Sequence, residues 1–139
     1  MVDKVSIKDK IRFYYLGSFI SNHFDIVYSL EEILNSSYDY VFGYYDNSIL
    51  IGFIHVNKLY ENMDIVNIVV DPNYRSKGIG NELIRYVFNY FDDLKQVMLE
   101  VNEHNESAIS LYLKNGFNVI NKRDKYYGND NALIMKRDV

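Results

Sequence analysis

The chain has 139 residues, of which 48% are hydrophobic and 24% charged, a balance typical of one folded domain and not of a disordered chain. Its formal net charge is −4 and it has no cysteine. This disfavours nucleic-acid binding and excludes disulfides, thiolate metal sites and a cysteine nucleophile. No apolar run reaches the about 18 residues of a membrane span, and residues 1–10 lack the pattern of a secretion signal. We therefore expect a single domain over residues 1–139, in the cytoplasm and not in a membrane.

The N-terminal third is predicted to form one short strand and two helices. Val5–Ile7 has the composition of a strand, and Asp9 is placed to cap a helix. A second helix is predicted from Ser29 to Asn35, because Ser29 and Glu32 have the spacing of a capping box. The apolar side of the first helix is predicted to carry Ile11, Tyr14, Tyr15, Ser18 and Phe19.

Strands dominate the rest of the chain, with two further helices. Tyr38–Tyr45 and Ile49–Val56 flank a polar turn, the pattern of a hairpin. Strands are also predicted at Met63–Val70, Val97–Val101, Phe117–Ile120 and Ala132–Met135. One helix follows Met63–Val70, with Leu83, Ile84, Val87, Phe88 and Phe91 on one face. Another is capped by Asn105 or Ser107 and ends at Asn115-Gly116. The element order, β-α-α-β-β-β-α-β-α-β-β, predicts a mixed α/β fold.

The link between Met63–Val70 and the helix that follows is the most informative segment. It reads Arg75-Ser76-Lys77-Gly78-Ile79-Gly80. Glycines there let backbone N–H groups approach a ligand, and the start of the helix adds partial positive charge. With Arg75 and Lys77, this predicts a phosphate site, although a loop that closes with flexible glycines is the alternative. A Walker loop is absent, and Leu83 stands where a dinucleotide fingerprint needs a small residue.

This segment resembles the acetyl-CoA signature [RQ]-x-x-G-x-[GA] of GNAT-superfamily N-acetyltransferases, which Arg75, Gly78 and Gly80 match. The segment from Leu99 to Phe117 is similar to that family's LEV-x-x-x-N-x-x-A-x-x-LY-x-x-x-GF pattern. Arg123-Asp124-Lys125-Tyr126-Tyr127 is similar to the R-x-x-YY of its ribosomal-protein alanine N-acetyltransferases. The resemblance covers nearly the whole chain. It implies a mixed central sheet with helices on both faces and a splay between the strands that end near Val70 and Val101.

The resemblance also implies where coenzyme A would bind. The backbone of Arg75, Ser76, Lys77, Gly78, Ile79 and Gly80 would wrap the pyrophosphate, so that a side chain at Gly80 would occupy its space. Ile68, Val69 and Val70 would pair with the pantetheine arm. Asn105 would contact that arm as well, and a plain helix cap is its alternative and compatible role.

Acetyl transfer to an amine requires a group that takes the ammonium proton and one that protonates the departing thiolate. The resemblance implies that Glu100 is the base, directly or through water, and that Tyr112 is the acid and also contacts the coenzyme. Judged by position alone, Glu100 is a solvent-facing strand carboxylate and Tyr112 a core aromatic. Tyr126 and Tyr127 are expected in the loop before the last strand, where they would bind the first peptide units of the acceptor; in a chain with 14 tyrosines, they are otherwise ordinary residues.

The predicted function is therefore acetyl transfer from acetyl-CoA to the N-terminal α-amine of a protein, such as a ribosomal protein. The alternatives are a small-molecule amine or lysine acetyltransferase, and a non-catalytic acyl-CoA-binding module. No metal site is predicted, because His23, His55 and His104 lack metal-ligand spacing. Lys122, Arg123 and Lys125 are expected at a solvated edge that at most assists a ribosomal substrate.

Overall fold

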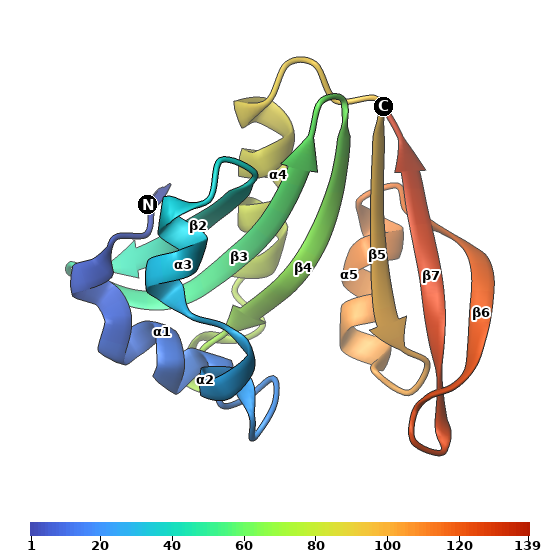
Figure 1. Cartoon of the computed structure of the whole chain (residues 1–139), viewed down its shortest axis with the longest axis horizontal. Coiled ribbons are helices and arrows are strands. Elements are labelled where there is room, and N and C mark those ends of the chain that lie inside the picture. The colour runs from blue at the N-terminus through green and yellow to red at the C-terminus, as the bar shows by residue number, and fades with distance from the viewer.

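The computed structural model describes all 139 residues and contains one seven-stranded sheet in the order β1-β2-β3-β4-β5-β7-β6, with helices on both faces (Figure 1). Neighbouring strands are antiparallel, except that β4 and β5 are parallel. No helix has the length and apolar character needed to cross a membrane. The strands are β1 (Val2–Lys4), β2 (Asp39–Asp46), β3 (Ile49–Leu59), β4 (Asn62–Val70), β5 (Gln96–Asn102), β6 (Asn118–Tyr127) and β7 (Asp130–Asp138); the α-helices are α1 (Lys10–Gly17), α2 (Phe24–Val27), α3 (Leu30–Asn35), α4 (Ile79–Tyr90) and α5 (Glu106–Lys114).

Two hydrophobic cores lie on the two faces of the sheet. We call the face covered by α1, α2 and α3 the front, and the face covered by α4 and α5 the back (Figure 1). On the front, Phe13 of α1 and Phe24 pack on Phe53 of β3. On the back, Leu83 and Val87 of α4 belong to a core that also contains residues of β2, β3, β4, β5 and β7. Helices therefore cover both faces, as predicted.

The sheet opens between β4 and β5. These strands pair only from Asn62–Gln96 to Ile65–Leu99. Directly afterwards Val66 is an extra residue of β4, because Val56 pairs with Ile65 and His55 with Asn67. Such a β-bulge bends its strand, and the two strands diverge toward their C-terminal ends (Figure 1). The predicted splay is confirmed, and it leaves residues 66–70 of β4 unpaired on the side of β5.

Several local predictions are also confirmed. The hairpin of β2 and β3 turns through Asn47 and Ser48, both with positive φ, as its tight connection requires. The hydroxyl of Ser29 accepts a hydrogen bond from the backbone N–H of Glu32 and caps α3. Asn105, and not Ser107, is the N-cap of α5.

Other predictions need correction. The first strand is Val2–Lys4, while Val5 follows it and is buried. The apolar side of α1 is Phe13 and Leu16, both fully buried, whereas Ile11 is 84% exposed. Apolar residues occupy so many positions of this helix that its periodicity is ambiguous, and docking onto Phe53 selects the buried side. Helix α2 was not predicted, and β6 and β7 extend well beyond the predicted Phe117–Ile120 and Ala132–Met135.

Candidate active site

Free backbone N–H groups line the link between β4 and α4. Ser76 and Gly78 have φ of 63° and 78°, and Gly78 is the N-cap of α4. From Arg75 to Asn81, no backbone N–H donates a hydrogen bond to another group of the protein. Successive amides in such a turn, together with the positive end of a helix dipole, form a site for an anion.

An ion pair holds the start of this link to α1. The carboxylate of Asp71 accepts hydrogen bonds from Arg12 Nη2, at 2.9 Å, and from the backbone N–H of Asn73, also at 2.9 Å. Arg12 Nε also donates to the carbonyl of Leu50 at 2.8 Å. Burial by itself would raise the pKa of Asp71, but the hydrogen bonds from Asn73 and Arg12 outweigh it and lower the pKa. Asp71 is therefore an anchor that keeps its charge.

The side chains of the link stay clear of its amides. Arg75 Nε donates to the carbonyl of Val70 at 3.2 Å, and Lys77 Nζ lies 5.4 Å from the centre of the Tyr74 ring. A Cβ atom added at Gly78 would meet nothing within 4 Å. Both cations and the open space at Gly78 thus suit the predicted phosphate site.

Gly80 has a packing role beside the one expected. A Cβ atom on Gly80 would lie 3.1 Å from the Cδ2 atom of Leu111. Its missing side chain lets α4 approach α5, which gives a second reason why a side chain is disfavoured at Gly80. That a side chain there would fill the space of the pyrophosphate stays a prediction. The contact with Leu111 joins two helices on either side of the splay, which the sequence pattern did not reveal.

The unpaired edge of β4 lies next to the link. Val69 is buried on the front, while Ile68 and Val70 pack against the back core. Toward β5 these residues have no strand partner, so their backbone edge is free to pair with an extended ligand. Across the splay, the side chain of Asn105 accepts a hydrogen bond from the N–H of Ala108 at 3.3 Å and caps α5.

Glu100 lies on the front face of β5, just beyond the last paired residue. An ion pair joins Glu100 Oε1 to Arg123 Nη2 at 3.1 Å. The guanidinium of Arg123 also lies 4.9 Å from the centre of the Tyr126 ring. Lys122, Arg123 and Lys125 are all exposed, so the predicted solvated edge is confirmed. Within it, Arg123 pairs with Glu100 and Lys122 Nζ lies 3.8 Å from Glu103 Oε1.

The ring of Tyr112 is buried, and it packs edge-on against Phe117 with 5.8 Å between ring centres. Its hydroxyl makes no hydrogen bond within the protein and is not among the polar atoms sealed from solvent. Burial, together with the nearby hydroxyl of Tyr127, raises the pKa of Tyr112, so the phenol keeps its proton. The ring of Tyr112 is therefore part of the core, as its position predicted, and its hydroxyl is free for the proposed role as acid.

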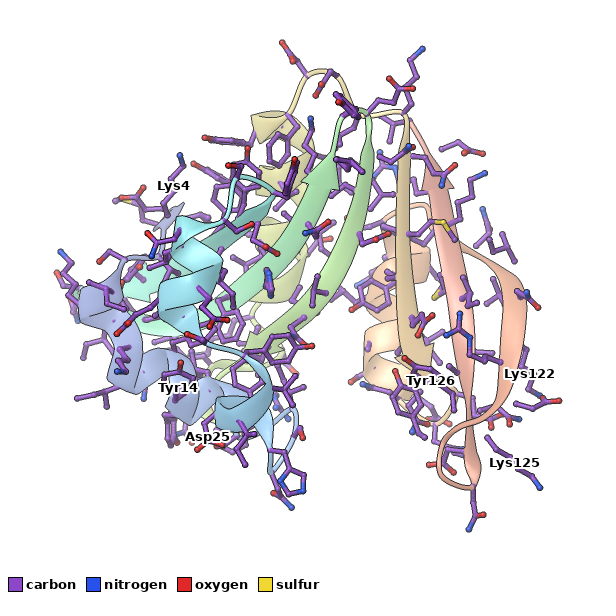
Figure 2. The ribbon with its side chains drawn as sticks, viewed as in Figure 1. Lys4, Tyr14, Asp25, Lys122, Lys125 and Tyr126 are labelled. Carbon is purple, nitrogen blue, oxygen red and sulfur yellow. The ribbon has the colours of Figure 1, made fainter.

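Tyr126 and Tyr127 end β6 and do not lie in a loop, which corrects the prediction. Their rings meet edge-on at 5.0 Å. Figure 2 shows Tyr126 on the side of the β6–β7 hairpin that faces the N-terminal half, with Lys122 and Lys125 on its outer side. Burial first, and then the charge of Glu100, raise the pKa of Tyr127. The pair therefore lies beside Glu100.

Three further residues of the candidate site were missed in the sequence. Asp64 of β4 shares the front face with Glu100, and Asn67 has a buried side-chain nitrogen without a partner. Tyr28, which ends α2, is close enough to Tyr127 to affect its pKa and packs against the ring of His55. Of the three, only Asp64 and Asn67 could have been found in the sequence, because they are polar residues inside an otherwise apolar strand.

The histidines lie apart from one another. His55 is buried and its Nε2 is 2.8 Å from Asp39 Oδ1, whereas the exposed His104 lies 3.4 Å from Asp130. Burial lowers the pKa of His55 and Asp39 only partly opposes this. No group of three or more histidine and acidic side chains in the structure could hold a metal ion.

Comparison with known proteins points to one family. The family model described as "Acetyltransferase (GNAT) family" matches residues 6–117. The Mycobacterium tuberculosis N-alpha-acetyltransferase RimI is 30% identical over 111 residues, which cover 76% of this chain and 70% of that protein. The Escherichia coli [ribosomal protein bS18]-alanine N-acetyltransferase is 30% identical over 95 residues, 64% of each sequence.

Solved structures share the fold. The crystal structure of the E. coli ribosomal-protein-S18-alanine N-acetyltransferase matches with a TM-score of 0.82 and 22% identity, over 100% of this chain and 93% of that one. That of the PaiA N-acetyltransferase from Thermoplasma acidophilum, in complex with coenzyme A, matches with a TM-score of 0.84 and 24% identity, over 100% and 98%. The chain spans only 28% and 31% of two longer curated relatives, from Bacillus subtilis and Mycobacterium leprae.

Proposed function

Since the chain belongs to the acetyltransferase (GNAT) family, we propose that it transfers the acetyl group of acetyl-CoA to a primary amine. The observation that carries this proposal is the run of unbonded N–H groups from Arg75 to Asn81, beside the unpaired edge of β4. The first feature suits a pyrophosphate and the second an amide-containing arm. Together they match the two chemically different parts of coenzyme A.

The coenzyme would then run from α4 to the start of the splay. The amides of residues 75–81 bind the pyrophosphate, and the edge of Ile68–Val70 pairs with the pantetheine arm. Asn105 borders the arm from α5. This path directs the thioester to the point where β4 and β5 separate, beyond Ile65 and Leu99. Complexes of GNAT neighbours with coenzyme A or acetyl-CoA support this choice of donor.

The two candidate catalytic residues lie on the β5 side of that point. Glu100, on the front, is the carboxylate that the family resemblance assigns to take a proton from the incoming ammonium, directly or through one water molecule. The neutral nitrogen attacks the carbonyl carbon, the C–S bond breaks, and the thiolate leaves. Tyr112 supplies a proton to the sulfur, since its hydroxyl has no partner within the protein and carries its proton at neutral pH.

The acceptor we favour is the α-amine at the start of a protein, as the names of the relatives suggest. Glu100, Tyr126 and Tyr28 all lie close enough to Tyr127 to affect its pKa, and this group of phenols beside Glu100 suits the first peptide units of an acceptor. An α-amine has a pKa of about 7.7–8.0 and lysine about 10.4. At neutral pH the α-amine therefore has a few hundred times more of the reactive neutral form.

The test compares three acceptors with acetyl-CoA and measures release of the coenzyme thiol. They are a peptide with a free N-terminus, the same peptide blocked at its N-terminus but carrying a lysine, and a small primary amine. We expect fastest release with the free N-terminus, in a panel that includes alanine as first residue. If the blocked peptide reacts faster, the acceptor is a lysine side chain and not an α-amine. If the small amine reacts faster, the acceptor is a small molecule. Acetyl-CoA binding without any transfer would instead favour the non-catalytic module.

A further inference from the structure

Two carboxylates, and not one, flank the point where β4 and β5 separate. Asp64 pairs in register with Met98, one rung before the last pair of Ile65 and Leu99. Met98 and Glu100 lie two residues apart on one strand, so Asp64 and Glu100 share the front face. The thioester of the proposed function would lie next to both.

The two carboxylates differ in what holds them. Glu100 is paired with Arg123 at 3.1 Å, so its negative charge is already compensated. Asp64 is exposed at the surface of the front face and has no hydrogen bond or ion pair. Partial desolvation and the charge of Glu100 both raise its pKa. Of two neighbouring carboxylates, the one without a cationic partner accepts a proton more readily.

We propose that Asp64, in place of Glu100, receives the proton that the acceptor ammonium gives up before attack, while Glu100 stays in its ion pair with Arg123. The inference rests on the proposed function and changes only the base within it. The N–H bond of the ammonium breaks and an O–H bond forms on Asp64, directly or through water. The neutral nitrogen then forms its bond to the acetyl carbon. When the amide forms, the nitrogen loses a second proton, which replaces the one that Tyr112 gives to the sulfur. Asp64 then returns its own proton to solvent.

The charged surroundings of Asp64 support this assignment. On the front face, Lys136 of β7 is held by Asp138 at 3.3 Å, and Asp39 of β2 is held by His55 at 2.8 Å. Arg123 of β6 is engaged by Glu100. No cation is thus paired with Asp64, and among the charged groups only Glu100 shifts its pKa. The other titratable groups of that face are Arg123, Lys136, Asp39, His55 and the phenols of Tyr28 and Tyr127.

An unpaired carboxylate whose pKa is raised by folding is a cost to stability near neutral pH. We therefore expect Asp64→Asn to leave the melting temperature unchanged or higher, and acetyl-CoA affinity in calorimetry within about twofold. Its kcat on a free-N-terminal peptide should fall by about 10²-fold at pH 7, as for loss of a general base. The deficit should shrink above about pH 9, where the α-amine is already neutral, and Asp64→Glu should restore most of the rate.

The controls separate this inference from the proposed function. Asp46→Asn removes an exposed strand-end carboxylate far from the site and should behave as wild type. Suppose that the wild type transfers acetyl groups. If Asp64→Asn then keeps the full rate, or loses the same share of the rate at every pH, the role of Asp64 is overturned but the proposed function is not. Absence of transfer by wild type would overturn the proposed function and this inference with it.

A second measurement needs no turnover. Carbon NMR titration of the Asp64 carboxyl should give a pKa above the ordinary aspartate value of about 3.9, and Glu100→Gln should lower it, since the neighbouring negative charge is gone. An Asp64 pKa that is ordinary, or unchanged by Glu100→Gln, would contradict the coupling of the two carboxylates.

Discussion

Tyr112 contains, within one side chain, a core residue and a free functional group. Its ring packs against Phe117 inside the back core, so that ring must be retained for the fold. Its hydroxyl forms no hydrogen bond within the protein, so removing the hydroxyl leaves no protein group unsatisfied. A substitution can therefore separate the two roles.

We predict that Tyr112→Phe keeps the melting temperature within about 1 °C of wild type and lowers kcat about 10-fold or more, because the thiolate loses its proton donor. Thermal unfolding and thiol release measure the two effects. Tyr86→Phe, on α4, is the matched control and should alter neither. Full activity of Tyr112→Phe would leave Tyr112 with only its core role.

Among the elements, α4 and α5 meet at Gly80 and Leu111 on the back of the splay. We predict that Gly80→Val weakens acetyl-CoA binding at least 10-fold and destabilises the fold, because its side chain would collide with Leu111 and separate the helices. Calorimetry and thermal unfolding measure both. Gly80→Ala should be mild, since only the flexible end of Leu111 must move.

The reason for the Gly80 effect can be tested separately. In the double variant Gly80→Val with Leu111→Ala, the helices can close again, and most of the affinity for acetyl-CoA should return. If the double variant regains stability but not affinity, the valine occupies the space of the pyrophosphate, as the sequence pattern had suggested.

Helix α1 fixes the start of the phosphate link through Arg12 and Asp71. We predict that Arg12→Ala destabilises the protein by about 1–3 kcal/mol, because it leaves a buried carboxylate short of a partner. This range is below that of a fully buried pair, since 31% of the Arg12 side chain is exposed. Acetyl-CoA affinity should fall too. Arg85→Ala, an exposed arginine without an ion pair, is the control for chemical unfolding.

The Arg12 effect should depend on pH. Folding lowers the pKa of Asp71, so its contribution is present above the unfolded pKa of about 3.9 and is lost as the pH falls through the folded value. The difference between wild type and Arg12→Ala should therefore be constant near neutrality and shrink below about pH 4. A difference that grows with acidity would contradict the ion-pair origin.

For the whole molecule, the splay leaves the sheet connected at its middle by a short parallel ladder, from Asn62–Gln96 to Ile65–Leu99. A coenzyme bound between the halves would bridge them. At a free concentration of 100 times Kd, it should stabilise the fold by about 2.7 kcal/mol and raise Tm by several degrees.

Hydrogen exchange can locate that stabilisation. The amides from Arg75 to Asn81 have no hydrogen-bond acceptor within the protein. They should therefore exchange fast in the free protein and slowly in the presence of acetyl-CoA. Amides in the turn at Asn47 and Ser48 should not change. Protection that spreads evenly over the molecule, without an excess at residues 75–81, would contradict the proposed pyrophosphate site.

Local patterns in the sequence were enough to predict the order of the strands and of every α-helix except α2, the hairpin, the cap at Ser29 and the glycine link before α4. These features depend on periodicity, turn residues and capping, all of which operate within a few neighbouring residues. The family resemblance, carried by Arg75, Gly78, Gly80 and the Leu99–Phe117 segment, likewise requires only sequence spacing. It predicted the splay as well as the fold.

Tertiary structure alone decided which residues meet. The pairing of Glu100 with Arg123, the approach of Gly80 to Leu111 and the shared face of Asp64 and Glu100 all join separate elements. The contact of Gly80 with Leu111 depends on helix docking. The other two depend on strand register, and a slip of one residue would turn each strand side chain to the opposite face. For the same reason, the buried side of α1 was mispredicted: many of its positions are apolar, and only packing against Phe53 selects Phe13 and Leu16.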